Sequence, residues 1–345
     1  MPKVIPRFHN EYLYNIRAMR DWAGIDRNTI AYWPLAAVHN AAMIVFNTPT
    51  HLAGGAVCIQ EAVDGVSFLS MIDKQRVTYT GGVLPIVVRV VECERRSEFN
   101  LSSVKQFIST NETPIVEREL KVPGFHIFGM AEGLCMLTRP RDPEQVRMTM
   151  IGKPISVHDE VRLLKPDSEE PVAVGEEGEF CCRGPYTIHG YYKAEDHNRK
   201  TFTSDGLYRS GDMMRATRIG GEVYYTFLGR IKDNIDRGAE KISAEEVERM
   251  VGEHDAVQNV AAVGMPDRVF GEKVCCYIIL KPGKTAPSVA ELGAFLESHG
   301  LAKFKWPERL EFVENFPVTK VGKVSKALLR QDVTEKLRQE QRKAG

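Results

Sequence analysis

The sequence lacks a long apolar run, an excess of either charge and any Cys-x-x-Cys pair. Without an apolar run of about 20 residues it offers no candidate for a transmembrane helix. Lys plus Arg and Asp plus Glu both number 46 among 345 residues, so the formal net charge is zero. This balance argues against nucleic-acid partners and against a polybasic membrane anchor. The first residues, MPKVIPRFHNEYL, also lack the apolar core of a signal peptide.

The seven cysteines include two adjacent pairs, Cys181–Cys182 and Cys275–Cys276, each inside an apolar run. Neighbouring residues of a strand point to opposite faces of a sheet, so the members of each pair are poorly placed to bond each other. The missing Cys-x-x-Cys spacing removes the usual zinc and redox motifs. We therefore expect reduced thiols packed on strands of a cytoplasmic protein.

The chain is long enough for two domains. Its first part mixes the two periodicities, which predicts an α/β fold: a helix over 10–22, apolar β runs at 56–59 and 83–91, and strands at 102–107 and 125–128. Between 160 and 230, short alternating segments are split by Gly, Pro and Asp turns. This pattern predicts an antiparallel β region that resembles a barrel.

Another unit is expected after Lys232. Residues 243–246 form a capping-box pattern that opens a helix. Strands and helices then alternate: strands at 256–263, 273–280 and 309–313, and helices at 288–298 and 326–342. This alternation predicts a compact α+β domain. We place the boundary within 230–233, which gives domains of residues 1–231 and 232–345.

Two segments place a carboxylate beside small residues. Residues 128–133 read FGMAEG, where Glu132 could hold a magnesium ion that carries phosphates; the alternative is a turn with an exposed glutamate. Residues 208–212 read YRSGD, where Asp212 could accept hydrogen bonds from two ribose hydroxyls. Its alternative is an aspartate that caps a turn.

Three more segments are rich in charge, glycine or aromatic residues. Residues 228–241 combine charges and a loop at the expected boundary, which suits a hinge or a solvated linker. We interpret residues 183–192, RGPYTIHGYY, as a structural turn with packed tyrosines. Residues 317–326, PVTKVGKVSK, carry three lysines at three-residue spacing, and lysines near a chain end are most often solvated.

In their order and spacing, these segments resemble the core motifs of the adenylate-forming superfamily, which includes acyl-CoA synthetases, luciferases and the adenylation domains of peptide synthetases. The matching stretches are FGMAEG, GEFCCRGPYTIHGYYK, YRSGDM, LGRIKDNIDRGAEKI and PVTKVGKVSK. The finer resemblance, carried by FGMAEGL, RGPYT and GYYK, is to the aryl-acid–AMP ligases of siderophore biosynthesis, a branch of nonribosomal peptide synthesis. It covers residues 2 to about 330. It implies part of a large adenylation domain, with an α/β sheet subdomain and a small antiparallel β-barrel, followed by a small mobile α+β domain.

The resemblance also implies an activity. ATP and an aromatic acid such as 2,3-dihydroxybenzoate or salicylate give an acyl-AMP and pyrophosphate, with magnesium present. The acyl group then passes to a thiol, on the phosphopantetheine of an aryl carrier protein or on CoA. Because the first step brings two anions together, catalysis is mainly positioning and charge neutralisation.

Residue roles follow from the matched motifs. The resemblance makes Lys323 the catalytic lysine between the substrate carboxylate and the α-phosphate, and Glu132 the magnesium-side carboxylate. The residues implied to bind the nucleotide are Gly129, Met130, Ala131, Asp212, Phe227 and Arg230.

Three further groups are implied outside the nucleotide site. Lys232 matches the hinge about which the small domain rotates. The residues implied to form part of the thiol tunnel are Arg237, Gly238 and Ala239. Those implied to line the aryl pocket are His39, Asn40 and Cys135, with the Asn40 amide bonding an ortho hydroxyl of the acid.

The sequence departs from the family pattern at its start. Only the end of the phosphate-gripping loop is matched, by Met1-Pro2-Lys3. The backbone N–H groups and hydroxyls that would cradle the outer phosphates are missing, as is the family's first subdomain. We therefore expect an aryl-acid–AMP ligase-like protein that is truncated at its N-terminus, and whether it is active as it stands is left open. Two alternatives stay open: an acyl-CoA synthetase that delivers to CoA, and a non-catalytic relic that binds a carrier protein.

Overall fold

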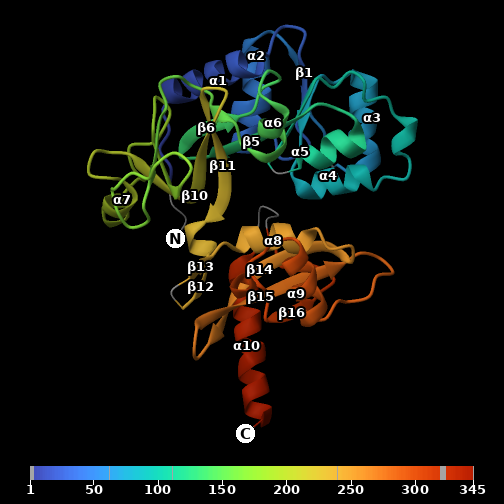
Figure 1. Cartoon of the computed structure of the whole chain (residues 1–345). Coiled ribbons are helices and arrows are strands. Elements are labelled where there is room, and N and C mark those ends of the chain that lie inside the picture. The colour runs from blue at the N-terminus through green and yellow to red at the C-terminus, as the bar shows by residue number, and fades with distance from the viewer. Residues whose placement is uncertain (1–3, 62, 111, 239, 319–323, 345) are drawn as a thin grey trace. The chain divides into compact units, whose positions relative to one another are not determined.

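The computed structural model describes residues 4–61, 63–110, 112–238, 240–318 and 324–344 (Figure 1). The chain divides into two compact units. Unit 1 comprises the described residues of Met1–Ser210 and Met214–Phe227, and unit 2 those of Gly211–Met213 and Leu228–Gly345. The predicted domain boundary after residue 231 stays a prediction.

Unit 1 contains a seven-stranded sheet with the order β2-β1-β3-β4-β5-β6-β7. Its strands are β1 (Ile30–Tyr32), β2 (Ala56–Cys58), β3 (Tyr79–Gly81), β4 (Gln106–Ser109), β5 (Gly124–Met130), β6 (Gly133–Leu137) and β7 (Lys153–Pro154). The strands from β2 to β5 pair in parallel, whereas β5, β6 and β7 pair antiparallel. The switch to antiparallel pairing places a tight turn between β5 and β6.

Helices cover both faces of this sheet (Figure 1). They are α1 (His9–Ala23), α2 (Thr48–Leu52), α3 (Gly65–Gln75), α4 (Leu84–Val91), α5 (Thr113–Ile115) and α6 (Glu144–Thr149), with the π-helical segments η1 (Ala42–Asn47) and η3 (Val116–Leu120) and the 3-10 helix η2 (Arg96–Glu98). Ile108 packs with α1 and η1, while its neighbour Phe107 packs with α3 and α4. Adjacent strand residues point to opposite faces, so each face has its own buried core.

The strand predicted over 83–91 is wrong, because most of this segment is helix α4. Short apolar runs do not by themselves distinguish a strand from a buried helix. Pro85 lies in the first helical turn, where its missing N–H costs no hydrogen bond. Ile86, Val87 and Val90 are buried, and this one-face spacing belongs to a helix.

The predicted antiparallel region is a four-stranded sheet with the order β11-β10-β9-β8. Its strands are β8 (Glu160–Leu164), β9 (Glu177–Arg183), β10 (Tyr208–Ile219) and β11 (Glu222–Arg230), and helix α7 (Glu195–Thr201) precedes β10. Over the described strands the sheet is open, so the expected barrel does not close. Cys181 and Cys182 on β9 enter two different core clusters, as their adjacency predicts.

Unit 2 is an α+β unit around a five-stranded sheet, β13-β12-β15-β14 with β16 beside β15. Its elements are η4 (Ile231–Asp233), β12 (Ile235–Arg237), β13 (Glu240–Ile242), α8 (Ala244–Gly252), β14 (Val257–Asp267), β15 (Gly271–Leu280), α9 (Val289–Ser298), η5 (Lys303–Lys305), β16 (Arg309–Phe312) and α10 (Lys326–Ala344). Cys276 packs with α8 and α9 on one face, and Cys275 packs with α10 on the other. The mixed fold class inferred from the sequence is therefore confirmed.

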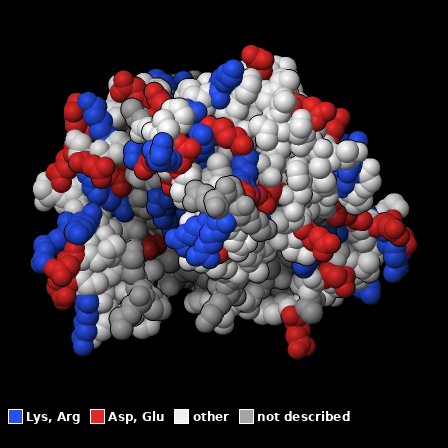
Figure 2. Space-filling model, turned by 90° about the horizontal axis from the view of Figure 1, so that it is seen from below, with Lys and Arg blue, Asp and Glu red and all other residues white. Residues whose placement is uncertain are grey.

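Surface charge is mixed. On the face shown in Figure 2, Lys and Arg side chains are interspersed with Asp and Glu rather than gathered over one element. Many of the charged side chains pair with each other, as in the contact between Arg309 and Glu340. Within the part of the chain that the structure covers, no helix has the length and apolar character needed to cross a membrane.

Candidate active site

The FGMAEG segment forms the turn between β5 and β6. Gly129 pairs with Cys135 and Met130 with Gly133 across this hairpin, so Ala131 and Glu132 lie at its tip. The Arg7 guanidinium donates a hydrogen bond of 2.7 Å to the Ala131 carbonyl. The predicted phosphate-side residues are thus consecutive residues of one tight turn, and Arg7, two residues before the start of α1, contacts that turn.

Glu132 is held by residues that the sequence reading took for a structural turn. The Tyr191 hydroxyl donates a hydrogen bond of 2.6 Å to Glu132 Oε1. The Tyr208 hydroxyl lies 3.0 Å from the Tyr191 hydroxyl. The Ile188 N–H donates to the Glu132 carbonyl at 2.7 Å. The only sequence signal for these contacts is the density of tyrosines in RGPYTIHGYY and YRSGD.

The surroundings of Glu132 fit a magnesium ion that also takes phosphate oxygens. Glu132 is partly exposed, and its Oε2 accepts no hydrogen bond from a described residue. Magnesium commonly uses one or two carboxylates and completes its octahedron with phosphates and water. Among the described residues no cluster of three His, Cys, Asp or Glu side chains could hold a metal by itself. A single carboxylate at a turn therefore suits a metal that arrives with ATP.

The two predicted ribose ligands lie together in unit 2. Asp212 on β10 is 2% exposed, and the Nε atom of Arg230 at the end of β11 lies 3.2 Å from Asp212 Oδ1. In unit 1, the Phe227 ring lies 5.8 Å from the Phe128 ring, measured between centroids. The structure thus places Asp212 beside Arg230, and Phe227 beside Phe128, the first residue of FGMAEG.

The predicted aryl-pocket residues come from two places in unit 1. The Tyr12 hydroxyl donates to Asn40 Oδ1 at 3.1 Å, which leaves the Asn40 amide hydrogens for other acceptors. His39 Nδ1 accepts the Ala41 N–H at 3.2 Å. The Arg7 guanidinium lies 4.7 Å from the centre of the Tyr12 ring. Arg7, just before α1, and Tyr12 on α1 therefore connect the FGMAEG turn to Asn40.

Cys135 lies on β6 and is buried with Phe46 in the core that α1 covers. Burial raises the pKa of its thiol, and the Asp159 carboxylate adds to the effect. The Cys135 N–H donates a hydrogen bond of 3.3 Å to the Tyr186 hydroxyl oxygen. The Tyr186 hydroxyl in turn donates to Asp159 Oδ2 at 2.7 Å. The thiol is thus a neutral, unreactive side chain, as an apolar pocket wall requires.

Asp159 should make stability depend on pH. Burial raises its pKa to about 6, although the hydrogen bond from Tyr186 lowers it, and its Oδ1 is buried without a partner among described residues. The folded pKa exceeds the unfolded value, so this contribution to stability is full below pH 4 and is lost as the pH rises through 6. We expect the difference in free energy of unfolding between the unmodified chain and Asp159→Asn to fall by about 2–3 kcal/mol from pH 4 to 7. Urea titrations of both proteins between pH 4 and 7 measure this difference. If the free energies of unfolding of the two proteins changed in parallel with pH, the raised pKa of Asp159 would be contradicted.

The predicted hinge and tunnel residues lie in unit 2. The Lys232 carbonyl accepts from Arg330 on α10 at 3.4 Å. Arg237 pairs with Glu308 at 2.9 Å, and its guanidinium lies 4.1 Å from the centre of the Phe270 ring. Gly238 has a φ of +66°, a left-handed conformation that suits glycine. Ala239 lies outside the described residues.

The lysine segment is described only at its two ends. Lys323, the predicted catalytic lysine, and Lys320 lie outside the described residues. Val318 and Val324 form an antiparallel bridge, and the Ser325 N–H donates to the Pro317 carbonyl at 2.8 Å.

The interpretation of Lys326 as solvated is wrong. Its Nζ lies 2.7 Å from Glu248 Oε1, and both side chains are 20% exposed. Glu248 lies on α8, which packs against β14. The start of α10 also packs against β14, so the two charges meet at a partly buried site that sequence spacing does not reveal.

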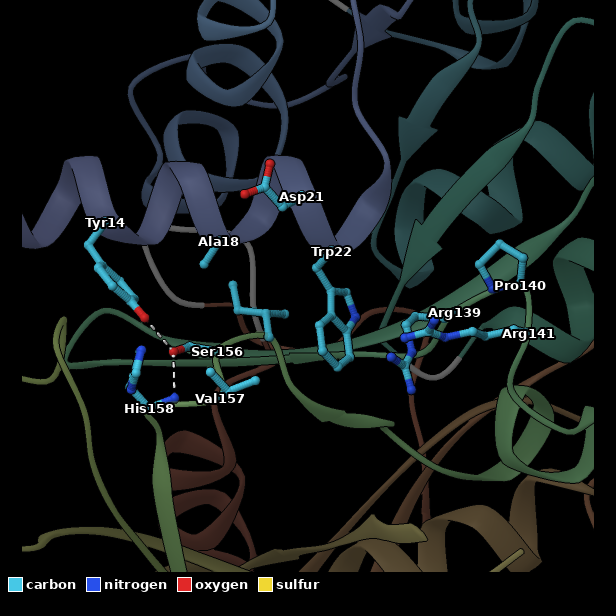
Figure 3. Close-up of a pocket in the computed structure, with 11 residues that line it drawn as sticks. Tyr14, Ala18, Asp21, Trp22, Arg139, Pro140, Arg141, Ser156, Val157 and His158 are labelled. Atoms are coloured by element: carbon cyan, nitrogen blue, oxygen red, sulfur yellow. Dashed lines mark hydrogen bonds between the residues drawn. The ribbon is translucent and has the colours of Figure 1, made fainter.

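A cavity of about 570 Å³ in unit 1 lies apart from these residues (Figure 3). It opens between α1 and the segments 139–141 and 155–158, and Tyr14 points across it to Ser156, with the two hydroxyl oxygens 2.7 Å apart. No predicted site residue is among its described lining residues.

Comparison with known proteins identifies the family. The AMP-binding enzyme family matches residues 1–192, more than half of the chain. This chain is a member of the AMP-binding enzyme family. The AMP-binding enzyme C-terminal domain matches residues 246–323, in unit 2. This AMP-binding enzyme thus carries the two family segments in the order that its motifs predict.

Individual relatives narrow the similarity. The 2,3-dihydroxybenzoate-AMP ligase of Bacillus subtilis (strain 168) is 41% identical over 347 residues, which cover 98% of this chain and 63% of that protein. The pyochelin synthase PchD of Pseudomonas aeruginosa (strain UCBPP-PA14) is 39% identical over 346 residues, covering 98% of this chain and 61% of that protein. The chain therefore spans about three fifths of the length of these curated relatives.

A solved structure supports the fold. ATP-bound MatB from Rhodopseudomonas palustris superposes with a TM-score of 0.86 at 22% identity, covering 96% of this chain and 65% of that chain. At this identity the likeness bears on the fold alone.

Proposed function

We propose that this AMP-binding enzyme is an aryl-acid–AMP ligase that activates 2,3-dihydroxybenzoate or salicylate. The observation that carries the proposal is 41% identity, across 98% of the chain, to a protein named 2,3-dihydroxybenzoate-AMP ligase. The contacts that connect Ala131 through Arg7 and Tyr12 to Asn40 support it, because they join the predicted acyl-phosphate turn to the predicted aryl pocket.

In the proposed first step, an oxygen of the aryl carboxylate attacks the α-phosphorus of ATP. A new oxygen–phosphorus bond forms, the bond from the α-phosphorus to the bridging oxygen breaks, and pyrophosphate leaves. Lys323 would neutralise the two anions as they meet. Asp212 and Arg230 would hold the ribose, and Phe227 would pack by the adenine. Magnesium, when bound with ATP beside Glu132, supplies positive charge to the leaving phosphates.

In the proposed second step, a phosphopantetheine thiol of an aryl carrier protein takes the acyl group and AMP leaves. Rotation about Lys232 would bring Arg237, Gly238 and Ala239 to the thiol path. CoA is the alternative acceptor, and product analysis with each thiol separates the two. A cytoplasmic location is proposed with this activity, and the seven free cysteines support it.

Exchange of labelled pyrophosphate into ATP tests the proposed activity. We expect exchange that depends on added 2,3-dihydroxybenzoate or salicylate. Benzoate, which lacks the ortho hydroxyl, should be at least about tenfold poorer, because the polar Asn40 amide would stay unpaired. Asn40→Ala should reduce the difference in exchange rate between benzoate and the two acids that carry an ortho hydroxyl. Equal exchange with all three acids would refute the role of Asn40, and no exchange with any of them would refute the proposed function.

A further inference from the structure

One aromatic segment, residues 184–192, holds Glu132 at both its backbone and its side chain. The Ile188 N–H donates to the Glu132 carbonyl at 2.7 Å, and the Tyr191 hydroxyl donates to Glu132 Oε1 at 2.6 Å. Gly133 makes this approach possible, since a Cβ there would lie 2.4 Å from the Thr187 Cα. The segment therefore does more than close a turn, because it determines where the carboxylate lies.

Tyr191 is itself firmly held. The Tyr191 N–H donates to Asn198 Oδ1 at 2.8 Å, and Asn198 Nδ2 donates to the Tyr191 carbonyl at 2.9 Å. The Tyr191 ring also lies 5.1 Å from the His197 ring, measured between centroids. A side chain fixed at its backbone and its ring loses little more conformational entropy when its hydroxyl binds a partner. Tyr191 is thus prearranged to hold Glu132.

The hydrogen bonds run in one direction toward the carboxylate. A phenol has one hydrogen, and Tyr191 donates its own to Glu132. The contact of 3.0 Å with Tyr208 therefore uses the Tyr208 hydrogen. A phenol is protonated at neutral pH, so each of the two hydroxyls has a hydrogen to donate. Each donor in such a chain polarises the next, which strengthens the final bond to the carboxylate.

We propose that Tyr191 is a positioning residue for the magnesium-side carboxylate: its hydroxyl holds Glu132 through Oε1 and leaves Oε2 for the magnesium ion of Mg·ATP. The inference rests on the proposed role of Glu132. A metal-binding carboxylate that is free to rotate must be ordered when the metal arrives. Loss of such an outer partner typically costs about 10–100-fold in metal affinity.

Calorimetric titration with ATP, in magnesium and in EDTA, tests this role without requiring turnover. Tyr191→Phe removes one hydroxyl and keeps the ring. We expect it to raise the Kd for Mg·ATP by about 10-fold or more and to leave the Kd for metal-free ATP unchanged. The matched control is Tyr192→Phe, which removes the hydroxyl of the neighbouring residue, whose side chain is exposed, and should change neither Kd.

A double variant separates action through Glu132 from an independent effect. If Tyr191 acts through that carboxylate, Tyr191→Phe combined with Glu132→Gln binds Mg·ATP as Glu132→Gln does alone, within about twofold. If the loss of Mg·ATP affinity in the double variant were the product of the losses in the two single variants, the inference would be overturned. Equal losses with and without magnesium, which mark a purely structural role, or unchanged binding in Tyr191→Phe would also overturn it. Absence of magnesium-dependent ATP binding in the unmodified chain would overturn it as well.

The proposed function can fail separately. A chain that shows the predicted magnesium-dependent loss but exchanges pyrophosphate with no aryl acid would refute the proposed function and leave the role of Tyr191 standing. If the unmodified chain exchanges pyrophosphate normally and Tyr191→Phe binds Mg·ATP as tightly as the unmodified chain does, the role of Tyr191 is refuted and the proposed function stands.

Discussion

Replacing Lys323 with alanine is expected to lower the rate of acyl-AMP formation by about 10²–10³-fold. The reason is that the step brings a carboxylate close to a phosphate. The attraction of a lysine ammonium between the two anions is stronger in the transition state than in the bound reactants. The Kd for ATP, measured by calorimetry, should change only severalfold. Single-turnover formation of acyl-AMP measures the rate.

The matched control is Lys320→Ala in the same segment. It removes a lysine of the same type three residues earlier, and its expected effect on the rate is less than about threefold, as for a solvated side chain. Equal losses in both variants would mean that the segment contributes general positive charge rather than one catalytic lysine. An unchanged rate in Lys323→Ala would contradict the assignment of Lys323.

Replacing Gly133 with alanine is expected to lower the free energy of unfolding by about 3–5 kcal/mol. Gly133 has a φ of +133°, and a Cβ there would lie 2.4 Å from the Thr187 Cα and 2.5 Å from the Tyr186 carbonyl oxygen. Both contacts are with backbone atoms, so no side-chain rotation relieves them. The variant should also weaken Mg·ATP binding, because the shift separates Glu132 from the segment that holds it. Urea unfolding and calorimetry measure the two effects.

Gly206→Ala controls for backbone strain alone. Gly206 also has a positive φ, +88°, but a Cβ there would meet nothing within 4 Å. We expect a loss of about 1–2 kcal/mol and unchanged Mg·ATP binding. If the two variants were equally destabilised, the close approach of Thr187 to Gly133 would not be the cause.

The general architecture could be predicted from periodicity because its signals are local. The helices over 10–22 and 288–298 each depend on a few neighbouring residues, and the structure has them as α1 and α9. Cys275 and Cys276 separate onto two faces for the same reason. The segment 83–91 could not be assigned in this way, because its apolar run suits a strand and a helix equally until its neighbours are known.

Motif order names candidate site residues, whose roles stay predictions, but it does not reveal the contacts around them. Motif order brought forward Glu132, Asp212 and Arg230, and the structure places the last two in contact. The contact of Tyr191 with Glu132 depends on a segment 59 residues further along the chain folding back against it, which no local pattern reveals. Lys326 was misjudged for the same reason, since its partner Glu248 lies far away in the sequence.

The proposed activity joins an aryl acid to AMP. The most direct test is to incubate the chain with ATP, magnesium and either 2,3-dihydroxybenzoate or salicylate and to identify the product by mass spectrometry. We expect the corresponding aryl-AMP, with one pyrophosphate released for each molecule formed and none formed when the acid is omitted. A chain that forms no aryl-AMP with either acid, while it is folded and binds Mg·ATP, would contradict the proposed activity.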